Sequence, residues 1–319
     1  MNPHDGTVAQ YVSFAEHAPD SPCFHDWALR VAGDPDVLAW LDSLPVPKRQ
    51  PNLVFAAARW HGVPAPGPYA GLRDALLGDD GPLRETILAR ATQTNEVGRL
   101  ATLLPVFSRY DGPLALLEVG ASAGLNLHPD RYDYAWPPRG GLTGSGGPVL
   151  SAAVTGDVPV PLSRPEVAWR GGIDLHPLDV RDDDAMAWLE TLVWPEHADR
   201  RAQLRAAIAI AREDPVALVT GDLLDALPAL LEEASSYGTP VVFHSAVIAY
   251  LTADDRARFA AMMRDLVAAG RCHWVSNESP LVIPGVDVPE DDPRCRFLLL
   301  ADGEPVAWTH SHGRALDWV

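Results

Sequence analysis

The fold of this chain is decided by one stretch, which reads Leu116-Leu117-Glu118-Val119-Gly120-Ala121-Ser122-Ala123-Gly124-Leu125-Asn126. Its first residues continue an apolar run that begins at Leu114, after Gly-Pro, and ends at the glycine-rich turn. Such a run is typical of a strand buried on both faces of a parallel sheet. Glycine lets the backbone of the turn approach a ligand closely, and a helix that begins after it would offer free N–H groups. We therefore expect a strand, a ligand-binding turn and a helix.

The residues after this stretch alternate between strand-like and helix-like segments. Further strands are predicted by short apolar runs at residues 216–219, 241–243 and 272–275. Helices are predicted between them, at about residues 183–211, 223–233 and 254–268. Thr252 is a good N-cap for the last of these helices. Strands that alternate with helices indicate a parallel α/β sheet.

The two ends of the chain differ from this pattern. Residues 1–110 are predicted to form a helical subdomain, including a long helical stretch from about residue 83 to 104. The chain closes with two apolar runs, 296–300 and 305–310, joined by Asp302-Gly303, which is a hairpin signal. Residues 111–319 would then be one α/β domain, with a Gly/Pro-rich insertion of short strands at about 132–170.

Composition narrows the class of partner. The chain of 319 residues has 25 Lys and Arg against 43 Asp and Glu, a net charge of −18, so it would repel nucleic acid. No stretch reaches the roughly 18 apolar residues that a membrane helix needs, and the N-terminus does not resemble a secretory signal. Cys23, Cys272 and Cys295 have neither a disulfide nor a zinc spacing. We expect a cytoplasmic protein without a bound metal, whose partner is a small molecule.

Two functional interpretations of the turn compete, beside a merely structural turn. It fits a nucleotide-cofactor loop of the form E-x-G-x-x-x-G, and residues 120–124 also fit the G-x-S-x-G nucleophile elbow, with Ser122 as nucleophile. A hydrolase would take its acid from Asp287 or Asp302 and its histidine from His310 or His312. However, that fold places several strands before the elbow, whereas about 110 helical residues precede it here. The pattern favours the cofactor loop.

The turn resembles motif I of class I S-adenosylmethionine-dependent methyltransferases, with Ser122 where many of them have a glycine. The chain as a whole resembles the bacterial domain-of-unknown-function family 2332, which is placed near those enzymes. The resemblance runs through residues 92–99, 117–127, 172–180, 192–196 and 243–246. It implies a Rossmann-like sheet of seven strands whose last strands form the hairpin.

The methyltransferase resemblance also implies a cofactor, S-adenosylmethionine, and residues that hold it. Asp174, at the end of the next strand, would bind the ribose hydroxyls, or else cap a turn. Asp222 would meet the adenine, or else be a helix N-cap. The expected cofactor-binding residues are Glu118, Gly120, Ala121, Ser122, Gly124, Asn126, Asp174, Asp222, Leu223 and His244.

The predicted reaction is transfer of a methyl group from the cofactor to an unknown small molecule. His244, at a strand end, is the first candidate for a general base, although a lone histidine is more often structural. Tyr250 and Glu278 are further catalytic candidates, and Gln93, Asn95 and Glu96 are candidate substrate contacts. The alternatives are a serine hydrolase that uses Ser122 and an adenosyl-ligand-binding protein without catalytic activity.

Overall fold

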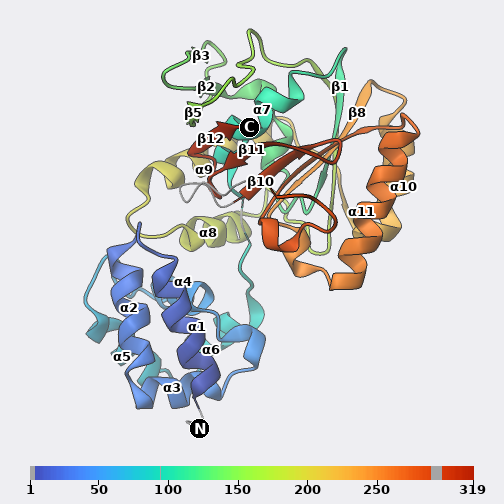
Figure 1. Ribbon diagram of the computed structural model, residues 1–319. Helices are drawn as coiled ribbons and strands as arrows, with labels where there is room; N and C mark the ends of the chain where they lie inside the picture. The colour runs from blue at the N-terminus through green and yellow to red at the C-terminus, as the bar shows by residue number, and fades with distance from the viewer. Residues whose placement is uncertain (1–3, 94, 289–296) are drawn as a thin grey trace. The chain divides into compact units, whose positions relative to one another are not determined.

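The computed structural model describes residues 4–93, 95–288 and 297–319 (Figure 1). The chain divides into two compact units. The first unit comprises Met1–Thr94 and Asp183–Ala202, and the second comprises Asn95–Asp182 and Gln203–Val319. Among the described residues, no helix is both long enough and apolar enough to span a membrane.

The first unit is helical. Its helices are α1 (Asp5–Glu16), α2 (Pro22–Ala32), α3 (Pro35–Asp42), α4 (Pro51–Trp60), α5 (Tyr69–Leu77), α6 (Pro82–Ala89) and α8 (Asp183–Leu192), with a 3₁₀ turn, η1 (Val46–Lys48). Several begin with proline in the first turn, where the missing N–H costs no hydrogen bond. Phe55 is the centre of the core, because Tyr11, Phe24 and Trp27 pack against its ring with centroids 5.9, 5.0 and 5.4 Å away.

The second unit is built on a large sheet. Among the described residues the sheet has nine strands, in the order β5-β12-β11-β10-β9-β8-β1-β6-β7. The strands are β1 (Leu114–Val119), β5 (Ala153–Thr155), β6 (Val167–Asp174), β7 (Leu218–Thr220), β8 (Thr239–Ser245), β9 (His273–Glu278), β10 (Phe297–Ala301), β11 (Glu304–Thr309) and β12 (Ala315–Trp318). The five strands from β9 to β7 are parallel, and β9 to β12 form an antiparallel meander. A separate small sheet holds β2 (Asp133–Ala135), β3 (Gly141–Leu142) and β4 (Val149–Ser151).

The order of the parallel strands creates a switch point beside β1. From β1 the chain builds β6 and β7 on one side, and then returns to build β8 and β9 on the other. The connections therefore part between β1 and β8, and in open α/β sheets ligands bind at the carboxyl ends of strands at such a point.

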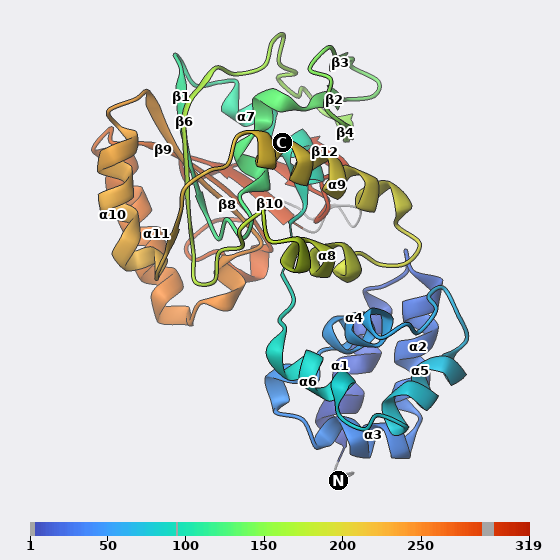
Figure 2. The ribbon, with the colours of Figure 1, turned by 180° about the vertical axis from the view of Figure 1, so that it is seen from behind.

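Helices cover the parallel strands on both faces. Helices α10 (Leu223–Ala234) and α11 (Ala253–Ala268) pack against a core that includes Leu117 and Val242 (Figures 1 and 2). Side chains alternate along a strand, so Phe243 faces the other way and meets Phe107 of α7 (Leu100–Phe107) at 5.2 Å between ring centroids. Helix α9 (Ala198–Glu213) crosses the boundary between the two units.

The prediction of an α/β protein with a mostly parallel sheet is confirmed. The sheet has nine strands rather than seven, because the chain adds β12 after the hairpin and β12 pairs with β5, which comes from the insertion. The hairpin is the pair β10–β11, with Ala301 opposite Glu304. Residue 296, at the start of the expected run, lies outside the described residues.

The prediction of one helix from residue 83 to 104 was wrong. Helix α6 ends at Ala89, and α7 begins at Leu100 after a 3₁₀ turn, η2 (Val97–Arg99). Asn95 and Glu96 use their side chains to accept hydrogen bonds from backbone N–H groups, at Ala123 and Gly98, which competes with helix formation. The first unit consequently ends at Thr94 rather than near residue 110. The helix expected over 183–211 is two helices, α8 and α9.

The contribution of the hairpin turn to the stability of the sheet can be tested at Asp302. Asp302 has φ +54°, and its Oδ1 accepts a 2.7 Å hydrogen bond from the backbone N–H of Trp274 in β9. Asp302→Ala should lower the free energy of unfolding by about 1–3 kcal/mol, because that N–H loses its acceptor. Asp302→Asn should keep most of the stability, since asparagine keeps the acceptor and tolerates positive φ. Urea denaturation would measure both, and equal losses would contradict this role.

Candidate functional site

The candidate site lies in the second unit, where β1 and β8 end side by side. Ser122 follows β1 with φ +52°, and Ala246 follows β8 with φ +59°. Residues other than glycine rarely adopt such angles, and they concentrate at ligand-binding and catalytic sites. The two strand ends at the switch point therefore both carry constrained backbone.

Glu118 is the last residue but one of β1, and its side chain is the central polar group of this site. It is 4% exposed, and its Oε1 accepts a 2.9 Å hydrogen bond from Nδ2 of Asn126. Its Oε2 and the Oδ1 of Asn126 are buried without a hydrogen-bond partner among the described residues. These two unpaired oxygens favour a ligand that brings hydrogen-bond donors and, at Glu118, a positive charge that favours the carboxylate form.

Burial also changes the acidity of this carboxyl group. Burial raises the pKa of Glu118 to about 8, and the charge of Asp174 contributes to the rise, while the Asn126 amide and the Arg99 guanidinium oppose it. Glu118 is thus mostly protonated at neutral pH. A cation placed against Oε2 would favour the carboxylate and release the proton.

Asp174, at the end of β6, holds the turn in place. Its Oδ2 accepts the N–H of Ser122 at 2.8 Å, and its Oδ1 accepts the N–H of His176 at 2.8 Å. Asp174 therefore caps two turns, as the second interpretation of this residue expected. Each of its oxygens can still accept another hydrogen bond.

The polar segment before α7 contacts the same turn. Asn95 donates to Oγ of Ser122 at 2.7 Å and accepts the N–H of Ala123 at 3.2 Å. Glu96 is 3.1 Å from Nδ1 of His312. Within the second unit, Asn95 therefore contacts the turn, and Glu96 lies beside His312 near the end of the chain. Gln93 belongs to the first unit.

Arg99 is a site residue that the sequence reasoning did not select. Its side chain donates to the carbonyl oxygens of Ser245, at 2.9 Å, and Ser311, at 2.8 Å, and its charge acts on Glu118. It therefore ties the end of β8 to the C-terminal turn. The one signal in the sequence was its place in the polar run 92–99.

Gly120 was expected to leave room for a ligand, and the structure contradicts this. Gly120 has φ +72°, and a Cβ atom on it would lie 2.4 Å from Cγ2 of Val247. The space above it is thus filled by a valine of this chain. Gly124, with φ +69°, is also needed for its backbone angle, and it lies against Leu218.

The helix expected after the turn is also missing. Gly124 leads into two 3₁₀ turns, η3 (Leu125–Leu127) and η4 (Pro129–Arg131), of three residues each. Proline at position 129 prevents a longer helix from continuing through it. The described turn consequently has no α-helix N-terminus to offer a ligand.

His244 is part of the core, and its buried partner Glu278 has one oxygen, Oε2, without a hydrogen-bond partner among the described residues. His244 has no exposed surface, its Nδ1 is 2.7 Å from Oε1 of Glu278, and its Nε2 accepts from Nε1 of Trp274 at 3.1 Å. Glu118 is in register with Phe243, so His244 faces the opposite side of the sheet. Neither ring nitrogen is left for a substrate.

The same Glu278 oxygen fixes the turn after β8, because it also accepts the N–H groups of Val247 at 2.8 Å and Ile248 at 3.3 Å. Tyr250 is 84% exposed and ends the 3₁₀ turn η5 (Ile248–Tyr250).

The remaining predicted cofactor residues have structural positions. Asp222 is the N-cap of α10, with its carboxylate 2.8 Å from the N–H of Leu224, while Leu223 is buried. Ala121 is buried beside Gly172.

A family model described as an uncharacterized protein conserved in bacteria, domain-of-unknown-function family 2332, matches residues 8–318. The chain belongs to this family. No curated protein and no solved structure matches it.

In this member of family 2332, the Ser122 hydroxyl accepts from the Asn95 amide, and the backbone N–H of Ser122 donates to the Asp174 carboxylate. Three of the histidines and acids suggested for a hydrolase have described contacts elsewhere. His310 accepts from the N–H of His312, His312 lies 3.1 Å from Glu96, and Asp302 pairs with His273 at 2.9 Å.

The contact between Gly120 and Val247 can be tested by a double-mutant cycle. Gly120→Ala should destabilise the protein by about 2–4 kcal/mol, since it adds positive-φ strain and overlap with the valine. Val247→Ala removes the overlapping atoms, so the double variant should be more stable than the sum of the two single losses predicts. Urea denaturation of all four proteins gives the coupling. Strict additivity would show that Val247 does not determine the need for glycine.

Proposed function

We propose that the second unit binds S-adenosylmethionine at the carboxyl ends of β1, β6 and β8, and transfers its methyl group to a small molecule. The observation that carries the proposal is the half-satisfied Glu118–Asn126 pair at the switch point of the parallel sheet. Methyltransferase motif I, which the sequence resembles, falls on these same residues.

The residues present offer acceptor atoms to this cofactor, but one glycine position that could have approached it is filled. The ammonium group and the ribose hydroxyls of S-adenosylmethionine are hydrogen-bond donors, and the acceptor atoms of Glu118 and Asn126 that lack a partner among the described residues suit them. Asp174 could accept a further hydrogen bond beside those it receives from Ser122 and His176. The space above Gly120 is occupied by Val247, so close backbone approach there does not contribute. Carboxylate and amide groups would carry the recognition.

The cofactor supplies a methyl group activated by the sulfonium charge, and the protein supplies position. Glu118 would ionise as it receives a cation, and the buried surroundings would strengthen that ion pair. Asp174 and Asn95 hold residues 122 and 123 in place while the ligand is bound. Transfer then depends on proximity and orientation, and a general base is needed only for an acceptor that begins protonated.

A binding protein without catalytic activity is the second candidate. The specific observation in its favour is that both ring nitrogens of His244 are paired, with Glu278 and Trp274, which leaves the expected general base no nitrogen for a substrate. A serine hydrolase is the third, and its support is the positive φ of Ser122 at a strand end.

Calorimetric titration with S-adenosylmethionine between pH 6 and 7.5 tests the proposal. If Glu118 must be ionised to bind the cofactor, affinity should rise up to about tenfold per pH unit, because its pKa of about 8 lies above this window. The α-amino group of the ligand stays largely charged there, since its pKa is about 8. Glu118→Gln should bind more weakly and lose the pH dependence. An unchanged affinity in this variant would exclude Glu118 as the recognition group.

Two product assays separate the three candidates. Methyl transfer from labelled S-adenosylmethionine to a bacterial metabolite extract should occur with the native protein and fall at least tenfold with Glu118→Gln. Cofactor binding without any labelled product would support the binding protein. Reaction with a fluorophosphonate that disappears in Ser122→Ala would instead support the hydrolase.

A further inference from the structure

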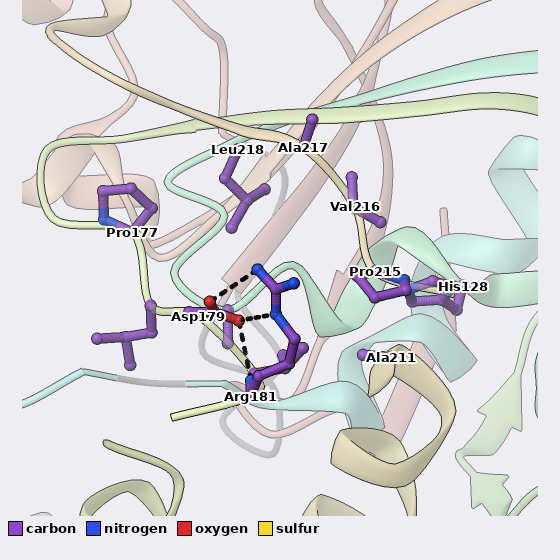
Figure 3. Close-up of a pocket in the computed structure, with 12 residues that line it drawn as sticks. His128, Pro177, Asp179, Arg181, Ala211, Pro215, Val216, Ala217 and Leu218 are labelled. Atoms are coloured by element: carbon purple, nitrogen blue, oxygen red, sulfur yellow. Dashed lines mark hydrogen bonds and ion pairs between the residues drawn. The ribbon is translucent and has the colours of Figure 1, made fainter. Parts of the chain in front are cut away.

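The second unit contains a cavity of about 310 Å³ that is distinct from the site at Glu118 (Figure 3). It lies between the segment that follows β6 and the segment that precedes β7. Its lining residues are Ala123, His128, Pro177, Leu178, Asp179, Val180, Arg181, Ala211, Pro215, Val216, Ala217 and Leu218. Glu118, Asn126 and Asp174 do not line it, so nothing proposed above accounts for this space.

Nine of the twelve lining residues are proline, valine, leucine or alanine, and the other three are His128, Asp179 and Arg181. A volume near 300 Å³ is at the small end of ligand-binding cavities in proteins, which are mostly apolar with a few polar groups that fix orientation. The apolar residues therefore suit a small molecule with an apolar ring or chain, and the polar residues determine which polar groups that molecule carries.

His128 is the buried polar group of the lining. It has no exposed surface, and its Nδ1 accepts a hydrogen bond from Nε of Arg170 at 3.3 Å. The remaining ring nitrogen, Nε2, is buried with no hydrogen-bond partner among the described residues. Burial and the charge of Arg170 lower the pKa of His128 to about 4, so at neutral pH the ring is uncharged and Nε2 carries a proton. His128 is thus a donor that lacks an acceptor.

Arg181 and Asp179 form the second polar element. The guanidinium pairs with the carboxylate through Nε and Nη2, each at 2.9 Å, and Asp179 also accepts the N–H of Arg181 at 2.9 Å. Figure 3 shows the Arg181 side chain held by Asp179 and pointing toward Leu218. The pair has no net charge and is largely exposed to solvent, and its planar guanidinium can stack on a flat ring at the cavity.

We propose that this cavity binds a neutral, flat heteroaromatic molecule of one or two fused rings that carries a hydrogen-bond acceptor. The apolar walls enclose the ring, the Arg181 guanidinium stacks on it, and the acceptor satisfies a donor such as His128 Nε2. An ion is disfavoured because the charged pair in the lining already compensates itself, and the net charge of −18 opposes anions.

Quinoline is a suitable probe, because it is neutral at pH 7.5 and has two fused rings and one acceptor nitrogen. Naphthalene has the same shape without the acceptor. Ligand-observed NMR should give a quinoline dissociation constant in the millimolar range. After the difference in their water-to-octanol transfer free energies is subtracted, quinoline should bind about 2–10-fold more tightly than naphthalene, because it gains one hydrogen bond. No quinoline binding at 5 mM, or equal binding of the two after this subtraction, would overturn the proposal.

Matched variants locate the binding. Ala217 is exposed at the cavity, so Ala217→Trp should fill its mouth and weaken quinoline binding at least tenfold. Ala269→Trp places the same side chain at an exposed residue after α11 and should bind as the native protein does. Arg181→Ala should weaken binding several-fold and does not depend on accommodating a tryptophan. Glu118→Gln should bind quinoline normally. Native affinity in both Ala217→Trp and Arg181→Ala would show that the ligand binds elsewhere.

Discussion

The half-satisfied carboxyl group of Glu118 is the constraint on which this account depends. It is the last residue but one of the central strand of the parallel sheet, it is almost fully buried, and one amide provides its described hydrogen bond. A buried acid without full pairing raises its pKa and weakens the fold at neutral pH, because unfolding lets it ionise. Such a cost is tolerated where a ligand offsets it, which is why we place the function at this residue.

Much of the scaffold around Glu118 could be predicted from sequence. Strand β1, helices α10 and α11 and the terminal hairpin carry strong local signals, namely apolar runs, caps and an Asp-Gly turn. The N-cap role of Thr252 is an example, since its hydroxyl accepts the N–H of Asp255 at 3.1 Å. Local chemistry settles such elements, because their stabilising contacts lie within a few residues.

The predictions about the site that were wrong concern features that depend on contacts distant in sequence. The need for glycine at position 120 comes from Val247, and the face on which His244 lies is set by its register with β1 and β9. A strand that is buried on both faces gives no alternation from which to read that face. The return of Asp183–Ala202 to the first unit has the same cause. Its contacts include those of Arg59 with the carbonyl oxygens of Thr191 and Val193, more than 130 positions away.

The central claim concerns one ionisation, which carbon-13 NMR of the glutamate side chains can observe directly, with Glu118→Gln to assign the signal. We predict that the Glu118 carboxyl titrates near pH 8 in the free protein, and that a saturating amount of S-adenosylmethionine shifts its midpoint below neutral pH. A midpoint near the ordinary glutamate value, unchanged by the cofactor, would contradict the account.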